Sequence, residues 1–411
     1  MTSEQAPAAL ANQRAVRRHN LGVVLRHLSE HGPRSRATIA VETGLNKTTV
    51  SSLVTELIGL ELVVERGLEQ RGTVGRPGQV VELSGDGVVA LGLEVNVDYL
   101  AVRALDLTGA ERHRGLDVRD NRRVPVAKVL DRLAEHARGA LDAVRAEGLR
   151  PVGATVALPG LVDAGAGTLL VAPNLDWTDV ALVDELRERL AGASFPLAAD
   201  NEANLAALAE LWEGSARGFR DVLYVSGEIG VGGGIIVNGE LFRGAAGFGG
   251  EFGHMTLDPN GRPCACGSRG CLETVVGLEA LLESAGLDPD SASTTTGSGE
   301  PVAALAARAR AGDDQALSAL RESGRWLGIA IASAANLLNF QAVVLGGFFG
   351  QLSTWLTAPI ERELEVHVLA SNWAIPRVLP STLGPEAAVR GAAAQSLRRV
   401  LADPVLAGAS V

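Results

Sequence analysis

The segment from Gly244 to Glu273, GAAGFGGEFGHMTLDPNGRPCACGSRGCLE, constrains this 411-residue chain more than any other. It contains every cysteine of the chain, preceded by one histidine: His254, Cys264, Cys266 and Cys271. Three thiolates and one imidazole are a complete ligand set for a tetrahedral zinc ion. Gly267 and Gly270 allow the short loop between the last two cysteines to fold back on itself. The spacing therefore predicts a structural zinc loop that leaves no coordination position open for catalysis.

Two other interpretations of the cysteines have less support. Three unrelated buried thiols would be an improbable coincidence, because all three cysteines lie between positions 264 and 271. A disulfide with one spare thiol needs an oxidising compartment, and no secretory signal is recognisable. We therefore expect a metal ion.

Two glutamates of the same segment, Glu251 and Glu273, suggest a second ligand. If His254 binds zinc through one ring nitrogen, its other ring nitrogen carries a hydrogen and donates a hydrogen bond. Nearby carboxylates can bind the same partner that accepts this hydrogen bond. A polyol suits such a set, because carboxylates accept from paired hydroxyls while the imidazole donates to them. Each glutamate on its own could equally be a solvated surface charge.

The GEFGH segment followed by CACGSRGCLE closely resembles the signature of the ROK family, which contains bacterial sugar repressors and sugar kinases. The resemblance extends over almost the whole chain. It implies that the histidine and the three cysteines bind zinc. It also implies that the following residues contact a sugar: Gly160, Asn174, Asn201, Glu202, Glu251, His254 and Glu273. Gly160 and Asn174 belong to a Pro-Gly turn and a Pro-Asn turn, which without the resemblance would be read as ordinary structural turns.

The loops that bind phosphate in ROK kinases distinguish a kinase from a repressor. ROK kinases have an aspartate where this chain has Glu202, and the longer side chain disturbs in-line phosphoryl transfer. Their Asp-x-Gly-Gly-Thr loop corresponds here to Glu94–Asp98, and Glu228-Ile229 replaces Gly-Thr in the second loop. Carboxylates there would repel a polyphosphate. We therefore expect no catalytic residue, and we interpret SGEIGVGGGII as a tight turn between two strands.

The N-terminal part has the pattern of a winged helix-turn-helix. Residues 1 to about 11 read as a disordered start, and helical periodicity follows from Asn12 to His31. The stretch SRATIAVETGLNKTTVSSLVTELIGLELV then reads as helix, turn at Gly44 and helix. The β-rich runs Leu62–Arg66 and Gln79–Leu83 predict a hairpin wing. An ordinary helical hairpin is the alternative.

The distribution of charge along the chain favours DNA binding by the N-terminal part alone. Residues 1–85 contain ten basic and eight acidic residues, whereas the whole chain has a net charge of −11. Short polar side chains at the start of the second helix can reach bases and phosphates, and arginines at the wing tip can enter a minor groove. The residues expected to contact operator DNA are Arg36, Asn46, Lys47, Thr48, Thr49, Ser51, Ser52, Arg71 and Arg76.

We predict an α/β chain in three parts. Residues 1–84 form the winged helix-turn-helix, 85–198 the first lobe with a C-terminal helix at about 386–401, and 199–385 the second lobe with the zinc loop. Strands alternate with helices beyond Ser84, which indicates α/β lobes. The resemblance implies a two-lobed actin-like (ribonuclease H-like) fold with sugar in the cleft. The Ser/Thr/Gly-rich segment 284–301 reads as a mobile connector.

These observations predict a sugar-responsive repressor of carbohydrate genes with a kinase-like but inactive sensor. We expect a cytoplasmic, nucleoid-associated homodimer, or a tetramer as a dimer of dimers, and no membrane segment, since no apolar run of about eighteen residues is present. Glu202 in the context Asn-Glu-Ala-Asn resembles the xylose-repressor branch, so the expected effector is an aldose such as xylose or glucose. The alternatives are an active ATP-dependent sugar kinase that also binds DNA, and a regulator that responds to a protein partner.

Overall fold

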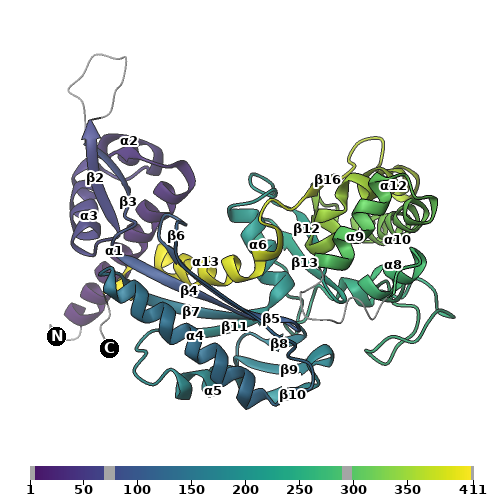
Figure 1. The fold of residues 1–411 in the computed structure, drawn as a ribbon. Coiled ribbons are helices and arrows are strands. Elements are labelled where there is room, and N and C mark those ends of the chain that lie inside the picture. Colours follow the sequence, from purple (N-terminus) through teal and green to yellow (C-terminus); the bar gives the residue numbers. More distant parts are fainter. Residues whose placement is uncertain (1–4, 69–78, 289–298, 409–411) are drawn as a thin grey trace.

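The computed structural model describes residues 5–68, 79–288 and 299–408, which form a small N-terminal head and two larger lobes (Figure 1). Arg71 and Arg76 of the predicted wing tip lie outside the described residues, as does the middle of the connector predicted at 284–301. Within the described ranges, none of the helices combines the length and the apolar character that a membrane span requires.

The head contains three helices and a three-stranded antiparallel sheet in the order β1-β3-β2. Its elements are α1 (Gln5–His31), β1 (Arg34–Ser35), α2 (Arg36–Thr43), α3 (Lys47–Gly59), β2 (Val63–Leu68) and β3 (Gln79–Leu83). Ser35 caps α2 by accepting from the Thr38 amide, and Gly44 ends that helix with φ of 73°. The predicted helix, turn, helix and hairpin strands are therefore all present.

The start of α1 differs from the prediction. Residues up to about 11 were expected to be disordered and the helix to begin at Asn12, but α1 begins at Gln5. Alanines make up much of this stretch and are the strongest helix formers. Pro7 lies in the first turn, where a missing amide hydrogen removes no intrahelical hydrogen bond.

The first lobe is built on a five-stranded sheet in the order β11-β7-β4-β5-β6. β4, β5 and β6 form an antiparallel meander, and β7 and β11 continue it in parallel with β4. The strands are β4 (Val88–Val95), β5 (Tyr99–Asp106), β6 (Glu111–Val118), β7 (Arg150–Leu158) and β11 (Leu197–Asn201). Helix α4 (Val126–Ala146) covers one face of this sheet and α13 (Ala387–Ala402) the other (Figure 1).

A small antiparallel sheet and a short helix complete the first lobe. The sheet has the order β10-β9-β8, and a 3-10 turn, η1, lies between β9 and β10 in the chain. These elements are β8 (Leu161–Asp163), β9 (Thr168–Ala172), η1 (Pro173–Leu175), β10 (Trp177–Val180) and α5 (Leu182–Arg189).

The second lobe repeats the strand plan of the first. Its sheet has the order β14-β13-β12-β15-β16, again with three antiparallel strands followed by two parallel ones. The strands are β12 (Val222–Gly227), β13 (Val231–Val237), β14 (Glu240–Leu241), β15 (Ala342–Gly346) and β16 (Arg377–Pro380). A repeated plan of this kind is what the family resemblance implied for a two-lobed chain.

Helices cover both faces of the second sheet. Helix α6 (Glu202–Trp212) packs with Val222 and Tyr224 on one face, whereas Leu223 and Val225 point to the other. That other face is covered by helices that follow Leu272 in the chain: α7 (Glu273–Val276), α8 (Leu278–Ser284), α9 (Gly299–Arg310), α10 (Asp314–Leu338), α11 (Gly347–Gln351) and α12 (Ser353–His367).

Helix α13 contacts all three parts of the molecule at close range. A Cβ added at Gly92 of β4 would collide with the Val389 carbonyl of α13, and a Cβ added at Gly391 would collide with the Leu205 carbonyl of α6. At the other end of α13, Gly22 of α1 lies directly against the Ala402 carbonyl. The C-terminal helix therefore packs on the sheet of the first lobe and also joins it to α6 and to the head.

The head is packed against the body and is not a loosely tethered module. One apolar cluster includes Leu25 and Leu53 of the head together with Leu105 of β5 and Leu397 of α13, and all four are almost fully buried. Burial of such side chains stabilises an interface by about 1.5–3 kcal/mol each.

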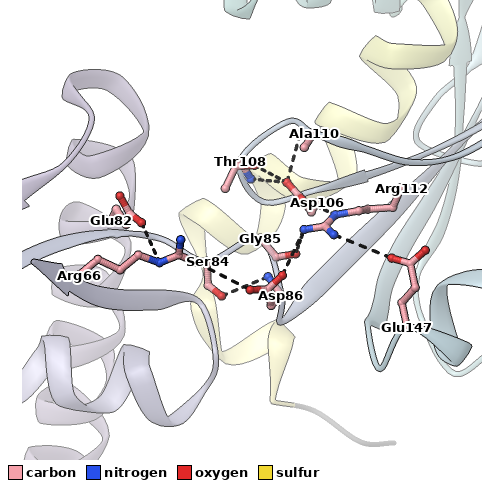
Figure 2. A network of polar contacts seen from close by, with 10 residues as sticks. All are labelled: Arg66, Glu82, Ser84, Gly85, Asp86, Asp106, Thr108, Ala110, Arg112 and Glu147. Carbon is pink, nitrogen blue, oxygen red and sulfur yellow. Dashed lines mark hydrogen bonds and ion pairs between the residues drawn. The ribbon is translucent and has the colours of Figure 1, made fainter.

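A polar network joins the head to the first lobe beside this cluster (Figure 2). The buried Asp106 accepts from Arg112 Nε at 2.6 Å. The same guanidinium donates to the Gly85 carbonyl at 2.8 Å and lies 3.3 Å from Asp86, in the linker after β3. Asp86 in turn lies 3.9 Å from Arg66 of β2. Arg112 thus holds the linker against the body.

We expect Gly391→Ala to destabilise the protein by about 1–3 kcal/mol, because a methyl group has no space between α13 and α6. Gly139→Ala is the matched control, since it is an exposed glycine inside α4 with open space around it. Alanine should stabilise that helix by up to about 1 kcal/mol. Denaturant unfolding measures both, and equal effects of the two substitutions would contradict the packing described for α13.

Candidate functional site

A pocket between the two lobes contains every residue that the sequence proposed for sugar binding. Its walls include Gly160, Asn174, Asn201, Glu202, Glu251, His254 and Glu273. These residues come from segments far apart in the sequence, so that only the fold brings them together. The pocket is strongly polar, with five carboxylate or imidazole groups and three side-chain amides along its walls.

The first-lobe wall is held by Asn201, the N-cap of α6. Its Oδ1 accepts from the amides of Ala203 and Asn204 at 2.9 and 3.2 Å, and its Nδ2 donates to the Gly160 carbonyl at 3.0 Å. Gly160 has φ of 102°, and a Cβ there would collide with the Val171 carbonyl, so glycine is required. Asn201 therefore positions the turn that lines the pocket and keeps one N–H for a ligand.

The second-lobe wall is formed by the loop after β14. His254 ends the short 3-10 helix η2 (Phe252–His254), which Glu251 precedes, and Glu273 begins α7. Glu273 Oε2 accepts from the Val231 amide at 3.0 Å, which fixes its carboxylate against the start of β13. Both carboxylates and the imidazole line the same pocket.

The four predicted metal ligands form one cluster beside that pocket. The ligand atoms of His254, Cys264, Cys266 and Cys271 all lie within 4.8 Å of one another. Cys266 Sγ and Cys271 Sγ are 3.7 Å apart, and Cys264 Sγ is 3.7 Å from His254 Nδ1. Two thiolates on a tetrahedral zinc ion lie about 3.8 Å apart when each Zn–S bond is about 2.3 Å long. The residues therefore fit a four-ligand metal centre, and the imidazole faces it through Nδ1.

Acidic side chains gather where the pocket extends toward α13. Glu94 of β4, Glu202 and Glu228 line this extension together with Asn96 and Tyr224. Glu94 Oε1 accepts from the Tyr99 hydroxyl at 2.6 Å, while Glu94 Oε2 is buried without a hydrogen-bond partner. The sequence singled out Glu94 and Glu228 only as substitutions in phosphate loops. It gave no reason to expect that the fold would place them beside Glu202.

Burial and mutual repulsion keep these carboxyls protonated up to a higher pH than is usual for glutamate. Burial, followed by the charges of Glu94 and Asp98, raises the pKa of Glu202 to about 8. Burial raises the pKa of Glu94 to about 7, against the hydrogen bonds from Tyr99 and Asn96. Burial and the charges of Glu202, Glu94 and Asp98 raise the pKa of Glu228 well above its ordinary value. A polyanion would therefore meet a desolvated surface of acid groups that offers it no cationic side chain.

The glycine-rich segment forms a hairpin turn, as the sequence interpretation favoured. β12 and β13 pair in antiparallel fashion up to Gly227 and Val231, and the Glu228 amide donates to the Gly230 carbonyl at 3.1 Å across the turn. The position of Glu228 in this turn places its carboxylate on the pocket side.

The head presents part of the predicted DNA surface freely. Lys47 and Thr48 are exposed at the first turn of α3, and Thr49 and Ser51 are half-buried there. Other members of the predicted set already have partners within the protein. Asn46 accepts from the Thr49 amide, and Ser52 accepts from Arg17. Arg36 donates to Glu65 at 2.6 Å and to the Ser51 carbonyl at 3.0 Å, so it holds α2, α3 and β2 together.

Known proteins resemble this chain along most of its length. The ROK family model matches residues 103–399. The xylose repressor of Bacillus subtilis (strain 168) is 31% identical over 385 residues, which cover 93% of this chain and 96% of that protein.

Two solved structures extend the comparison. A ROK family transcriptional regulator, described as a homologue of the E. coli MLC protein, has a TM-score of 0.78 at 27% identity and covers 95% of this chain and 98% of its own. A ROK family glucokinase from Streptomyces griseus, solved with glucose and AMPPNP, has a TM-score of 0.62 at 28% identity and covers 75% of this chain and 98% of its own. The regulators thus match almost the full chain, while the glucokinase matches about three-quarters of it.

We expect stability to fall as the pH rises from about 5 to about 8. Glu202 titrates near 8 in the folded protein and near 4.5 in the unfolded chain, so between these values only the folded state holds the proton. Glu202→Gln should therefore reduce the pH dependence of the unfolding free energy measured by denaturant titration. Glu188→Gln, at an exposed position of α5, is the control and should leave that dependence unchanged. An unchanged slope in Glu202→Gln would contradict the protonation described here.

Proposed function

Since the chain belongs to the ROK family, we propose that it is a sugar-responsive transcriptional regulator that represses genes of carbohydrate uptake or metabolism. The observation that carries this proposal is the presence in one chain of a compact three-helix head with a β-hairpin and a polar pocket between two lobes. Proteins named xylose repressors match the same span of head and body. Such a regulator acts in the cytoplasm, on the nucleoid when bound to DNA.

The head acts as a winged helix-turn-helix with α3 as its recognition helix. Lys47 and Thr48 at the exposed first turn of α3 are suited to contact phosphates and base edges. The caps on α2 and α3 and the Arg36 contacts fix the angle between the two helices, so that the first turn of α3 is presented rigidly. Arg36, Asn46 and Ser52 contribute to this geometry, and Arg71 and Arg76 extend the surface from the wing.

The effector is a neutral aldose such as xylose or glucose. Carboxylates accept hydrogen bonds from sugar hydroxyls, and His254 keeps Nε2 for the pocket when Nδ1 faces the metal. The acidic extension formed by Glu94, Glu202 and Glu228 disfavours ATP and sugar phosphates. The body is therefore a kinase-like sensor without phosphoryl-transfer activity.

The metal is zinc, and its role is structural. Three thiolates and an imidazole are a closed zinc set, which leaves no open position for a reacting water. The ion ties the loop that carries Glu251 and His254 to the start of α7, where Glu273 lies. Loss of the metal would release all three pocket groups together, which links metal binding to sugar binding.

Sugar binding reaches the head through packed elements. Glu202 and Asn201 begin α6, which packs on α13 at Gly391, and α13 meets α1 at Gly22. Closure of the two lobes on a sugar shifts α6 relative to the first-lobe sheet, and α13 carries that shift to the base of the head. The sugar thereby changes the spacing of two DNA-binding heads in a dimer.

An active kinase that also binds DNA is the second candidate, because a glucokinase that holds glucose and AMPPNP shares the fold of the body. The acidic residues in both phosphate loops argue against it. A regulator that responds to a protein partner has no specific observation in its favour.

A selection from random duplex DNA with the full-length protein tests the function. We expect the selected DNA to contain inverted repeats, and the affinity of the protein for them to change at least about tenfold on addition of xylose or glucose. ATP with Mg²⁺ should have no effect on this affinity, and no sugar phosphate should form.

Lys47→Ala should weaken DNA binding by ~1 kcal/mol and lower the salt dependence of binding by about one ion. Lys128→Ala, the other lysine of the chain and exposed on α4, is the matched control. Absence of selected DNA, or formation of a sugar phosphate, would overturn the proposal.

Cys266→Ser should lose zinc and weaken aldose binding about tenfold or more, because the pocket groups lose their common anchor. Metal analysis and calorimetry measure the two effects, and DNA affinity without sugar should stay close to wild type. Ser268→Ala, an exposed change in the same loop, controls for the substitution itself. Full aldose affinity in a metal-free Cys266→Ser protein would refute the link between metal and pocket.

A further inference from the structure

A cavity of about 660 Å³ lies in the first lobe, close to the end of α3 in the head. Its walls come from the end of α4, the start of β7, α5 with the loop that follows it, and the short helix η5 (Pro404–Ala407). Among the described residues, none lines both this cavity and the pocket between the lobes. The cavity is therefore a separate site, and it has the volume of a site for a small molecule.

Three arginines line this cavity, and none of the described residues in its walls is acidic. They are Arg145 near the end of α4, Arg150 at the start of β7 and Arg187 in α5, and we call the site the arginine cavity. The whole chain has 48 acidic and 37 basic residues, so positive charge alone in one cavity is contrary to its composition. Because guanidinium groups bind carboxylate and phosphate oxygens through parallel N–H groups, an anion fits this site.

Arg150 has a hydrogen-bond donor that the protein does not use. Its Nη2 donates to the Leu60 carbonyl at 3.1 Å, while its Nε is buried and has no hydrogen-bond partner among the described residues. A buried N–H group without a partner lowers stability, and more so on a charged group. Such groups in native proteins are normally satisfied by water or by a ligand. Arg150 can therefore bind a ligand in the cavity without losing an existing partner of Nε.

The other two arginines take part in weak ion pairs. Arg145 lies 4.0 Å from Asp142, and Arg187 donates to Asp184 at 2.8 Å. Both are exposed pairs between residues three apart on one helix, and such pairs contribute little to stability. Since a guanidinium has five N–H groups, each of these arginines keeps donors for an anion in the cavity.

Apolar side chains complete the walls of the cavity. Leu149 and Val152 are almost fully buried, Phe195 is half-buried and Leu406 is exposed at the rim. Apolar walls with a few convergent charged groups are typical of sites for organic ligands, because apolar contact adds affinity while the charged groups fix the orientation. An inorganic ion would leave these apolar walls uncovered.

We propose that the arginine cavity binds a small organic anion, a carboxylate or a phosphate monoester on an apolar body, and that the bound anion loosens the end of α3 from the first lobe. The three guanidinium groups bind the anionic oxygens, while Phe195 and Leu406 contact the apolar body. The acid groups of the pocket between the lobes disfavour an anion. Neutral and anionic effectors therefore have separate sites.

The effect on α3 follows from the position of Arg150. Leu60, whose carbonyl accepts from Arg150, is the C-cap of α3. An anionic oxygen is a stronger acceptor than a neutral carbonyl, so a bound anion draws this guanidinium away from Leu60. The wall formed by η5 reaches the same residue, because a Cβ added at Gly408 would lie 3.1 Å from Leu60 Cδ2. A consequence for DNA affinity rests on the proposed function, in which α3 is the recognition helix.

Titration calorimetry of the full-length protein, without DNA or sugar, tests the site. Phenyl phosphate, benzoate and benzyl alcohol are the probes, because they combine an aromatic ring with a phosphate, a carboxylate and a neutral hydroxyl. We expect an anionic probe to bind once per chain, and benzyl alcohol to bind at least about tenfold more weakly. The tighter of the two anions identifies the class of the natural ligand. Binding of neither anion, or equal binding of benzyl alcohol, would overturn the proposal.

Arginine variants test the location of the bound anion. The double change Arg145→Gln and Arg187→Gln should weaken binding about tenfold or more, and melting should stay close to wild type because both side chains are exposed. Arg150→Lys should weaken binding to a similar extent, because lysine lacks the planar fork. Arg321→Gln, at an exposed position of α10, is the matched control and should bind as wild type. Undiminished binding in the arginine variants, or loss of binding in Arg321→Gln, would refute the assignment to this cavity.

Hydrogen exchange of the same protein tests the effect on α3 without DNA. The amides of Leu60, Glu61 and Leu62 donate to carbonyls of the last turn of α3. Saturation with the anionic probe should speed their exchange in wild type and leave it unchanged in Arg150→Lys, and it should lower DNA affinity about fivefold or more. Unchanged exchange in wild type saturated with the anion would contradict the effect on α3. Faster exchange in a protein that selects no DNA would support this inference while the proposed function fails.

Discussion

The close packing of α13 is the constraint on which the rest of the structure depends. One helix touches the backbone of β4, of α6 and of α1, and glycine is the residue at each contact: Gly92, Gly391 and Gly22. Because backbone lies against backbone there, no flexible side chain can absorb a displacement. A shift of α6 relative to the first-lobe sheet must therefore move α13, and a shift of α13 must move the head. The apolar cluster around Leu397 and the Arg112 network make that connection stiff.

The proposed metal cluster lies in the loop that forms the second-lobe wall of the pocket. The loop that carries Glu251 and His254 has little regular structure, and the spacing of its cysteines suits one ion. A loop of this kind keeps a defined shape only if a strong local interaction replaces the missing secondary structure. The opposite wall needs no metal, because Asn201 caps α6 and holds the Gly160 turn. The pocket thus combines a wall set by secondary structure with a wall whose loop carries the four proposed metal ligands.

Much of this arrangement could be predicted from the sequence, and the reasons differ between elements. The turn between α2 and α3 is marked in the sequence by Gly44, so the order helix, turn and helix could be predicted. The caps of these helices, Ser35 and Asn46, were not recognised, and Asn46 was assigned to DNA contact instead. The start of α1 was not predicted, because an alanine-rich end was taken as disordered. The predicted metal ligands lie close together in the sequence, and the structure brings their ligand atoms within 4.8 Å of one another. Contacts between distant segments could not be predicted, above all the gathering of Glu94, Glu202 and Glu228 and the engagement of Arg36 by Glu65.

The acidic extension of the pocket shows how such a body can keep a kinase-like shape and serve as a sensor. Polyphosphate binding needs backbone amides and positive charge, whereas this extension of the pocket is lined by buried carboxyls. Carboxyls that remain protonated near neutral pH can donate as well as accept hydrogen bonds, so they suit hydroxyl groups and not phosphates. Their mutual repulsion also opposes closure of the empty pocket once they ionise. A bound polyol that satisfies these groups would then favour the closed state, and this difference in affinity is what a ligand needs to drive a conformational change.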